Sequence, residues 1–484
     1  MSKPIVWTIA GSDSGSGAGI QADLLTFHDL NTHGCTVITA LTAQNSHAVT
    51  KVEVPSDSFL QAQIDTLMSD LPPQAIKLGM LANKNVMQTL KPFLENLNKP
   101  IVCDPVMIST SGHALLEQEN CDYFIKHIIP CATVLTPNKL EAEYLLNHKI
   151  HSSSDIEKSA NELLKYGAQS VLLKGGHTEN DFAQDYWTDG KHSCWITQYR
   201  HQHIHNHGSG CTLSAAITAA LASGYDLENS LVIAKAYVSR GIRLAKPIGK
   251  GPGPVIHAAW PTTAEDYPWL TKTAVAGVER TQFPALIQPI GFYPIVPNIE
   301  WLKKLLDLGV TTIQLRMKDK TGEALAKEIK DAVTLAKSYQ AQLFINDFWE
   351  LALEFGAYGV HLGQEDLETA NIKALAEQGL RLGISTHSYA ELANAHAYRP
   401  SYIALGPIYP TTSKTMAFGP QGLARLQEWR QLSEYPVVAI GGITLERAHA
   451  VKATGVDGIA VISAITEAED LKASVKAWQE LMKP

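Results

Sequence analysis

A glycine-rich turn at the start of an apolar helical pattern carries a cysteine. Residues 207–215 read HGSGCTLSA. Gly208, Ser209 and Gly210 can direct backbone N–H groups into a cavity, and a helix that begins there adds the positive end of its dipole, which favours an anion. The same position is expected to lower the pKa of the Cys211 thiol, because the dipole stabilises the thiolate. An arbitrary cysteine is more often a small buried residue, but its place on this turn favours a general base beside an anion site.

A second glycine-rich loop follows the first predicted strand. Residues 11–19 read GSDSGSGAG, and glycines allow backbone N–H groups to approach a ligand closely. Asp23 follows in the first turns of the next helix, where its carboxylate could accept hydrogen bonds from an amine or a hydroxyl of a ligand. The alternative is an aspartate that only complements the helix dipole. The spacing alone does not separate these two roles.

Four more polar residues fit a nucleotide site. Asn138 and Glu141 are three residues apart in TPNKLEAEYL, so they share one helical face and could hold a hydrated Mg²⁺ beside phosphates, although this spacing is also common on surface helices. Lys174 ends the strand pattern of SVLLKGG and could meet a nucleotide phosphate. Asp104 ends the pattern of PIVCD and either supports the metal or caps a turn.

Polar residues in the second half gather where predicted strands end. Gln314, Arg316 and Lys318 alternate along QLRMK, so all three point the same way. Cations that point into one cavity are costly unless an anion meets them. Asp347 and Asp366 follow two neighbouring strands, and paired carboxylates suit Mg²⁺, which prefers oxygen ligands. These residues predict a metal-assisted anion site.

A second anion site is predicted around the last strands of the second half. AIGGI and AVISA follow the seventh and eighth strand patterns, where barrels commonly build a phosphate site. A diphosphate and a second phosphorylated substrate would fill the two sites. Any one of these residues alone would be interpreted as a solvated charge or a turn, but their place on one face favours the site. One loop, GPIYPTTSKT, adds Thr411, Thr412, Ser413 and Lys414.

The elements that must position these residues differ between the two halves. In the first half, apolar strand patterns alternate with helical stretches, which predicts a mainly parallel sheet with helices on both faces. Alternation on both sides of Asp189 and Gly190 predicts a hairpin. In the second half, eight strand patterns alternate with amphipathic stretches, which predicts a (β/α)8 TIM barrel. These patterns span residues 291–296, 311–316, 342–347, 359–363, 381–386, 402–408, 436–442 and 458–463.

Length and composition fit two soluble domains. The chain has 484 residues and a formal net charge of -8, which allows two cores and argues against a general nucleic-acid binder. Its six cysteines form no CxxC pair and no apolar run could span a bilayer, so we expect a cytoplasmic protein with no membrane or nucleic-acid partner. We place a first domain at residues 1–265, a connector that could pack as a helical segment at 266–287, and a second domain at 288–484. The oligomeric state stays open, with a homodimer among the assemblies considered.

The first half resembles the hydroxymethylpyrimidine/phosphomethylpyrimidine kinases, which have a ribokinase-like α/β/α sandwich. The resemblance covers about residues 4–257 and rests on AGSDSGSGAGIQAD, GCTVITALTAQNS, KLGML, CDPVM, LTPNKLEA, LLKGGH, HGSGCTLSAAI and GKGPGPV. It implies ATP as co-substrate and Cys211 as the base, with Gly208 and Gly210 in its anion hole. Ser16 departs from the family pattern, in which glycine is commoner. By resemblance, the aminopyrimidine would contact Asp23 and Gln44, with Met80 and Val106 as apolar walls.

The second half, about residues 290–480, resembles thiamine phosphate synthase. In that family the CH2–O bond of a pyrimidine diphosphate breaks, pyrophosphate leaves, and a thiazole nitrogen attacks the resonance-stabilised cation. By resemblance, the pyrimidine diphosphate would be held by Gln314, Leu315, Arg316, Met317, Lys318, Asn346, Ser385 and Lys414, and Mg²⁺ by Asp347 and Asp366. The thiazole phosphate would be held by Thr411, Thr412, Ser413, Gly442, Ile462 and Ser463.

These resemblances imply a bifunctional enzyme in which one half makes the substrate of the other. One alternative is a pyridoxal-type kinase fused to a thiazole tautomerase-like barrel, which would need no diphosphate clamp. Another is a thiamine-precursor sensor that binds without catalysis. Retention of Cys211 and of both candidate Mg²⁺ carboxylates counts against the sensor.

Overall fold

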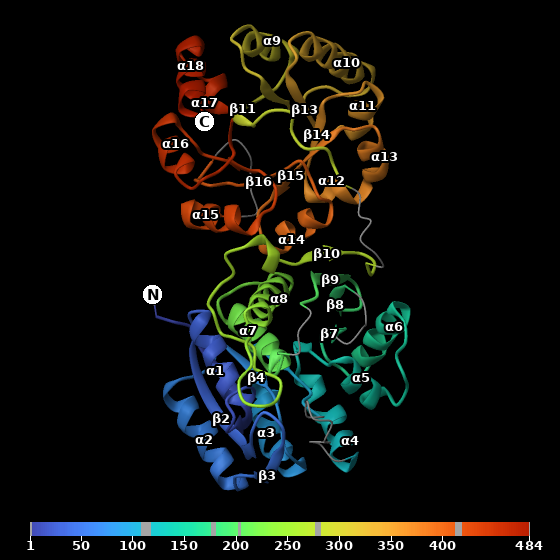
Figure 1. The fold of residues 1–484 in the computed structure, drawn as a ribbon, viewed down its shortest axis with the longest axis vertical. Coiled ribbons are helices and arrows are strands. Elements are labelled where there is room, and N and C mark those ends of the chain that lie inside the picture. The colour runs from blue at the N-terminus through green and yellow to red at the C-terminus, as the bar shows by residue number, and fades with distance from the viewer. Residues whose placement is uncertain are drawn as a thin grey trace. The chain divides into compact units, whose positions relative to one another are not determined.

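The computed structural model describes residues 2–107, 118–175, 181–201, 205–275, 282–411 and 419–483 (Figure 1). The chain divides into two compact units. The first comprises Met1–Pro261 and Glu265–Ala276, and the second comprises Thr262–Ala264 and Gly277–Pro484. The predicted connector includes residues 276–281, which lie outside the described residues.

A ten-stranded sheet forms the centre of the first unit, in the order β10-β9-β8-β7-β6-β5-β4-β1-β2-β3. The predicted parallel core and the predicted hairpin of β8 and β9 are both confirmed. Two antiparallel edge strands, β3 and β10, were not predicted, and β10 lies in the segment where we expected a helical connector. The parallel strands are β1 (Ile5–Asp13), β2 (His33–Gln44), β4 (Ala75–Leu78), β5 (Ile101–Cys103), β6 (Val134–Leu135) and β7 (Val171–Lys174), and the others are β3 (Val49–Glu53), β8 (Phe182–Thr188), β9 (Ser193–Tyr199) and β10 (Trp269–Thr271).

Helices cover both faces of this sheet, as the alternation along β1 illustrates. Val6 packs with Phe27 and Ala215, whereas the next residue, Trp7, belongs to the large core that contains Leu60. Neighbouring strand residues face opposite sides, so each face of β1 has its own apolar layer. The helices are α1 (Gly19–Asp29), α2 (Asp57–Asp70), α3 (Lys84–Asn96), α4 (Gln118–His127), α5 (Lys139–Leu146), α6 (Ser153–Leu164), α7 (Ser209–Ala222) and α8 (Leu227–Arg243).

The second unit is a closed barrel of eight parallel strands, which confirms the predicted TIM barrel. All eight predicted strand patterns form barrel strands. They are β11 (Gly291–Val296), β12 (Thr312–Leu315), β13 (Gln342–Asn346), β14 (Gly359–Leu362), β15 (Arg381–Thr386), β16 (Tyr402–Leu405), β17 (Val437–Ile440) and β18 (Gly458–Val461). Tyr293, Phe344 and Tyr402 are among the side chains that fill its interior.

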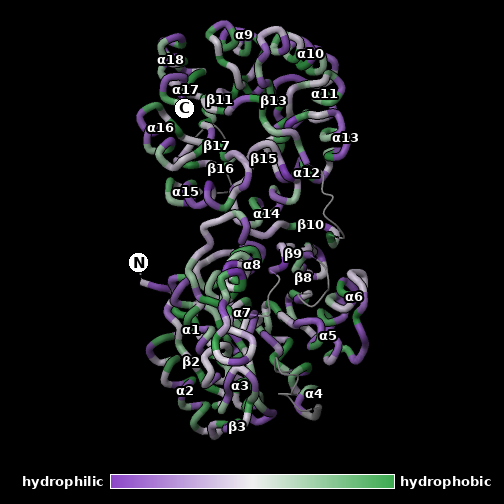
Figure 2. Tube along the Cα trace, viewed as in Figure 1, coloured by the Kyte–Doolittle hydropathy of each residue, from purple (hydrophilic) through white to green (hydrophobic). Residues whose placement is uncertain are grey.

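Amphipathic helices surround the barrel strands. Outer helices such as α9 and α10 carry both hydrophobic and hydrophilic residues (Figure 2), so one side packs on the barrel and the other meets solvent. The helices are α9 (Ile299–Asp307), α10 (Gly322–Ser338), α11 (Trp349–Glu354), α12 (Gln364–Thr369), α13 (Ile372–Glu377), α14 (Tyr389–Ala397), α15 (Gly422–Leu432), α16 (Leu445–Lys452), α17 (Ser463–Thr466) and α18 (Leu471–Leu481). Among the described residues, no helix combines the length and apolar character that crossing a bilayer requires.

Candidate functional site

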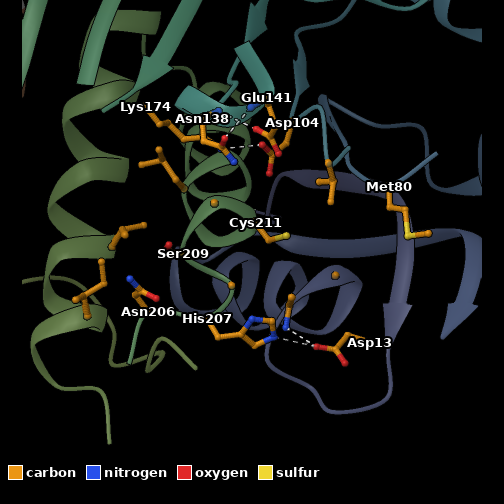
Figure 3. Close-up of a pocket in the computed structure, with 18 of the residues that line it drawn as sticks. Asp13, Met80, Asp104, Asn138, Glu141, Lys174, Asn206, His207, Ser209 and Cys211 are labelled. Atoms are coloured by element: carbon orange, nitrogen blue, oxygen red, sulfur yellow. Dashed lines mark hydrogen bonds and ion pairs between the residues drawn. The ribbon is translucent and has the colours of Figure 1, made fainter. Parts of the chain in front are cut away.

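One cavity of about 440 Å³ lies in the first unit, where the parallel strands end and α7 begins (Figure 3). This is the edge of an open α/β sheet at which ligands usually bind. The structure brings residues as far apart in the sequence as Ala10 and Ile242 into its lining, and only Asp23 among the predicted kinase-site residues is absent from it. The predicted residues that line the cavity are Gln44, Met80, Asp104, Val106, Asn138, Glu141, Lys174, Gly208, Gly210 and Cys211.

Cys211 is the third residue of α7, on the turn where a helix start was predicted. Gly208 is the N-cap and has a φ of 78°, a left-handed conformation that favours glycine. A Cβ atom at Gly208 would also overlap the carbonyl oxygen of Gly17. Glycine therefore lets this turn pack directly against the opening loop, and the packed turn aims the start of α7 into the cavity.

The pKa of Cys211 is displaced in the direction opposite to the one expected from the helix dipole. Burial raises it to about 11, and the positive charge of Lys77 only partly opposes this effect. Desolvation penalises the thiolate more strongly than the nearby cation and the helix start stabilise it. The thiol is consequently protonated at neutral pH.

Lys77 and Asp23 form an ion pair at the floor of the cavity that sequence reasoning missed. Both side chains are fully buried, and Lys77 Nζ lies 2.9 and 2.8 Å from the two Asp23 carboxylate oxygens. Thr8 donates a third hydrogen bond to Asp23, at 2.6 Å. Desolvation acts to lower the pKa of Lys77, but the charge of Asp23 outweighs it and holds that pKa above its usual value. Lys77 lines the cavity and Asp23 lies behind it, so the predicted contact between Asp23 and a ligand stays a prediction.

A second group of charges lies at the ends of β5, β6 and β7. Lys174 Nζ donates to Asp104 Oδ1 at 2.9 Å. Asn138 and Glu141 form a capping box at the start of α5, with the Asn138 N–H donating to Glu141 at 2.7 Å and the Glu141 N–H donating to Asn138 at 2.9 Å. Burial raises the pKa of Glu141 to about 7, although Lys174 opposes that shift.

The predicted Mg²⁺ fits this second group by its chemistry. Glu141 and Asp104 are buried oxygen donors near one another, and burial together with the charge of Asp104 raises the pKa of Glu141. Within the described ranges, no cluster of three or more His, Cys, Asp or Glu side chains could hold a metal alone. Mg²⁺ commonly binds through one or two carboxylates together with substrate phosphates, so a nucleotide would complete the donor set.

Asp13 ties the opening loop to the turn before Cys211 (Figure 3). Its carboxylate accepts N–H groups of Gly15 at 2.8 Å, Gly17 at 3.1 Å and Ala18 at 2.9 Å, and lies 3.6 Å from His207 Nε2. Burial acts to raise the pKa of Asp13, but His207 and the backbone donors outweigh it and lower that pKa. 

Ser16, in the same opening loop, has a φ of 61°. This is the left-handed region that glycine adopts most easily. The loop thus keeps a glycine-like conformation at the position where this sequence departs from the family pattern.

A third buried pair, Asp185 and Lys235, was not predicted. Lys235 Nζ donates to Asp185 Oδ2 at 2.7 Å, and the N–H of Gly175 donates to Asp185 Oδ1 at 3.1 Å. Asp185 lies opposite Lys174 in the β7–β8 ladder, so this pair fixes the backbone just beyond that lysine. Neither residue stands in a recognisable motif, because the contact joins a hairpin strand to a helix 50 residues away.

In the barrel, the predicted diphosphate stretch divides into buried and exposed residues. β12 ends at Leu315, so the alternation expected for Gln314, Arg316 and Lys318 does not continue along a strand. Gln314 is buried and donates a hydrogen bond to Tyr293. Leu315 and Met317 are also buried, while Arg316 is half-buried and Lys318 is exposed.

The two predicted Mg²⁺ carboxylates follow neighbouring strands, as expected. Asn346 ends β13 and is buried, and Asp347 comes next, exposed and with a φ of 65°. Asp366 accepts the N–H of Gly363 at 2.9 Å and so caps α12 after β14. This pair of oxygen donors fits Mg²⁺, and phosphate oxygens would supply further ligands. 

The residues predicted to hold the thiazole phosphate follow β16, β17 and β18. Gly442 has a φ of 66°, and a Cβ atom there would overlap the carbonyl oxygen of Pro410, so the backbone after β17 lies against the loop that contains Thr411. Ile462 precedes α17 and Ser463 begins it. The predicted Thr412, Ser413 and Lys414 lie outside the described residues.

Comparisons with known proteins match each unit separately and the chain as a whole. The phosphomethylpyrimidine kinase family model matches residues 13–256, and the thiamine monophosphate synthase family model matches residues 292–465. A probable thiamine biosynthetic bifunctional enzyme of Oryza sativa is 31% identical and aligns with 100% of this chain and 89% of its own length. The thiamine-phosphate synthase of Serratia proteamaculans is 52% identical over 42% of this chain and 96% of its own length.

Solved structures resemble the first unit. A pyridoxal kinase from Staphylococcus aureus, in complex with AMP-PCP and pyridoxal, is 35% identical with a TM-score of 0.50. The match covers 54% of this chain and 95% of the kinase. It shows the ribokinase-like fold expected for the first unit.

Proposed function

The chain belongs to the bifunctional thiamine biosynthetic enzymes, and from that premise we propose that the cavity of the first unit is the kinase site and the C-terminal end of the barrel is the synthase site. One unit phosphorylates hydroxymethylpyrimidine and its monophosphate, and the other joins the resulting diphosphate to thiazole phosphate, giving thiamine phosphate and pyrophosphate. The observation that carries the site assignment is the gathering of Cys211, its anion turn and the Asp104–Lys174 group around one cavity.

In the kinase site, Cys211 is the proposed base. Because the thiol is protonated at neutral pH, it must first lose its proton. The thiolate then accepts the proton of the substrate hydroxyl as that oxygen attacks the γ-phosphorus of ATP and the bond to ADP breaks. The N–H groups at the start of α7 hold the oxygens of the transferred phosphoryl group, and Lys174 neutralises part of their charge. When bound, Mg²⁺ neutralises charge on the nucleotide phosphates, and Asp104, Asn138 and Glu141 are the residues that would hold it.

The pyrimidine end of the kinase site lies beyond Cys211. Gln44 supplies an amide for the aminopyrimidine, while Met80 and Val106 enclose the ring. Asp23 would act on that ring through Lys77, because the lysine stands between the carboxylate and the open space. A ligand that reaches Asp23 directly would have to displace Lys77.

In the synthase site, the diphosphate lies among Arg316, Lys318, Asn346, Ser385 and Lys414, and the thiazole phosphate lies among the backbone groups after β17 and β18. The positive side chains stabilise the charge that develops on pyrophosphate as the CH2–O bond breaks. The thiazole nitrogen then donates its electron pair to the pyrimidine methylene and becomes a thiazolium. When bound, Mg²⁺ adds Lewis-acid stabilisation of the leaving group, and Asp347 and Asp366 would hold it.

A coupled assay tests both assignments at once. Purified protein receives labelled hydroxymethylpyrimidine, ATP, Mg²⁺ and thiazole phosphate, and the monophosphate, the diphosphate, thiamine phosphate and pyrophosphate are followed in time. We expect the two phosphates to appear in order and pyrophosphate to accompany thiamine phosphate. Tight binding of the precursors with no turnover would instead support the sensor.

The pyridoxal-type alternative has one specific observation in its favour, the 35% identity between the first unit and a pyridoxal kinase. A competition assay separates the two substrates by the ratio of their kcat/KM values. We expect hydroxymethylpyrimidine to be preferred, because the barrel that accompanies this kinase consumes the pyrimidine product. The tautomerase-like barrel would release no pyrophosphate.

Compartment and assembly belong to the same proposal. All six cysteines lie within the described residues and are free, which supports work in a reducing compartment such as the cytoplasm. We expect no nucleic-acid partner, given the net charge of -8. Light scattering of the purified chain tests whether it forms a homodimer.

A further inference from the structure

A relay of five hydrogen-bonded side chains crosses the interior of the barrel and ends at Ser385. Gln314 Nε2 donates to the Tyr293 hydroxyl at 3.1 Å, and the hydroxyls of Tyr293 and Tyr402 lie 2.8 Å apart. The Tyr402 hydroxyl lies 2.7 Å from His361 Nδ1, and His361 Nε2 lies 2.8 Å from Ser385 Oγ. These five residues stand on five different strands, β11, β12, β14, β15 and β16.

The relay is buried except at its Ser385 end. Tyr293, Gln314 and Tyr402 are at most 2% exposed and His361 is 7% exposed, whereas Ser385 is half-buried. Burial raises the pKa of Tyr293 and of Tyr402, so both phenols stay protonated. A buried chain of neutral groups therefore reaches a side chain proposed to contact the pyrimidine diphosphate.

Packing holds the middle of the relay in place. The Tyr402 ring stacks on His361 with ring centroids 5.6 Å apart, and Phe344 packs edge-on against Tyr402. Gly383 lies beside the Tyr402 ring, and any Cβ atom there would overlap it. Because the rings are fixed, the freedom that remains in the relay is which group donates in each hydrogen bond.

The direction of the protons follows from Tyr293. Its oxygen accepts a hydrogen bond from Gln314, and Tyr402 is its other hydrogen-bonding partner within the described part of the chain. If Tyr402 donated to Tyr293, the Tyr293 hydroxyl hydrogen would be buried without an acceptor, which is costly. Tyr293 therefore donates to Tyr402.

The remaining bonds follow in order. The Tyr402 oxygen already accepts, so its hydrogen goes to His361 Nδ1, which must then carry a lone pair. In the neutral imidazole the proton is left on Nε2. His361 Nε2–H donates to Ser385 Oγ, and the Ser385 hydroxyl hydrogen is free to point outward.

We propose that this relay locks His361 in the Nε2–H tautomer and thereby makes the Ser385 hydroxyl a hydrogen-bond donor to an acceptor atom of the pyrimidine diphosphate. The inference rests on the proposed synthase site, in which Ser385 touches that ligand. His361, Tyr402 and Tyr293 are positioning residues, because none of them is proposed to touch the ligand and each acts through hydrogen-bonded neighbours. Reversing the relay would turn Ser385 into an acceptor and leave two acceptors facing each other across the site.

Nitrogen NMR of the full chain tests the tautomer without any substrate. We expect the His361 ring to show a protonated Nε2 and an unprotonated Nδ1 at neutral pH, with its signals assigned by comparison with His361→Gln. A proton on Nδ1 would overturn the proposal. Because no ligand is present, this result stands even if the wild-type chain proves to lack synthase activity, which would instead refute the proposed function.

Tyr402→Phe tests whether the relay matters to the ligand. Removing the donor to Nδ1 frees the tautomer, and we expect the KM for the pyrimidine diphosphate to rise about tenfold with a smaller change in kcat. The matched control is Tyr389→Phe, which also removes a buried hydroxyl, one that donates to Glu428 at 2.8 Å in the same barrel but outside the relay. Equal KM values in wild type and Tyr402→Phe, or equal losses in both variants, would overturn the proposal.

Two His361 variants carry the same test if Tyr402→Phe does not fold. Glutamine can place an amide N–H near the position of Nε2, whereas asparagine is too short to reach Ser385. We expect His361→Gln to keep the KM within about threefold of wild type and His361→Asn to raise it about tenfold. Equal effects of the two variants, or a larger loss in His361→Gln, would refute the relay.

Discussion

The two sites of this chain hold their polar groups in opposite ways. In the kinase cavity each of three lysines is already paired with a carboxylate, and the pairs are Lys77–Asp23, Lys174–Asp104 and Lys235–Asp185. In the barrel, Lys318 is exposed and neither it nor Arg316 makes an ion pair within the described ranges, whereas the buried polar chain is neutral. The charged groups of the cavity are therefore already paired, and in the proposed synthase site the barrel mouth would gain its charge balance from the ligand.

The largest expected effect is the loss of the kinase step in Cys211→Ala. Removing a general base lowers the rate roughly 10²- to 10⁴-fold. Synthase turnover should be unchanged, because that reaction takes place in the other unit. Separate assays of ATP consumption and of pyrophosphate release measure the two steps.

Cys194→Ala is the matched control for this prediction. Cys194 lies on β9, is also partly buried and does not line the cavity, so both activities should survive its loss. Normal phosphorylation by Cys211→Ala would show that Cys211 is not the base. Cys211 would then be only a neighbour of the anion turn.

The next effect concerns the fully buried ion pair. Asp23→Asn leaves the Lys77 ammonium without its partner, and we expect the first unit to lose about 3–5 kcal/mol of unfolding free energy. Hydrogen exchange of the full chain in urea measures this loss unit by unit. Asp122→Asn, on the exposed side of α4, should change almost nothing. A double variant with Asp23→Leu and Lys77→Met should regain most of the stability, because it removes both buried charges. A further loss in the double variant would contradict the uncompensated charge as the cause of the destabilisation.

Asp347→Asn tests the proposed metal site of the barrel. Asparagine tolerates the left-handed conformation of residue 347 and keeps the shape of the side chain, so the change removes charge alone. We expect synthase turnover to fall about 100-fold if this carboxylate holds Mg²⁺, with the kinase step intact. The exposed Asp331→Asn, on α10, is the control. Unchanged turnover across a Mg²⁺ titration would exclude Asp347 from metal binding.

The strands that carry both sites could be predicted from the sequence, and this has a physical reason. Buried parallel strands must be continuously apolar, so all eight barrel strands and the parallel core of the first unit are visible as apolar runs. β3 was missed because four of its five residues are exposed and its sequence is largely polar. β10 was missed because its three residues follow a proline-rich segment and pair only with the edge strand β9.

Site residues were predictable where a backbone motif announces them and not where a tertiary contact creates them. The anion turn around Cys211 is local in sequence, so its glycines and its helix start identify it. Lys77 becomes part of the site only because Asp23, 54 residues away, neutralises it. His361 likewise acquires a role from Tyr402, 41 residues away on another strand. The direction of the Cys211 pKa shift was wrong for the same reason, since desolvation depends on the whole cavity.

The smallest expected effect concerns Asp13, whose side chain ties the opening glycine-rich loop to the turn before Cys211. Asp13→Asn keeps the shape of the loop but weakens its hydrogen bonds from Gly15, Gly17 and Ala18, which should cost the first unit about 1–2 kcal/mol at pH 7. The folded state lowers the pKa of Asp13 below its ordinary value of 3.8. Its contribution is thus present above that value and lost as the pH falls through the lower, folded-state pKa.

Urea unfolding of wild type and Asp13→Asn at several pH values between 3 and 7 measures this contribution. The difference between the two proteins should be constant at the upper end and shrink below about pH 4, because the wild-type carboxylate then takes up a proton. Asp189→Asn is the control, since Asp189 also accepts backbone N–H groups beside a histidine but its side chain is 31% exposed against 5% for Asp13. A difference that stays constant down to pH 3 would mean that the Asp13 charge does not hold the loop, and the kinase cavity would then resemble the barrel mouth more closely than its buried pairs suggest.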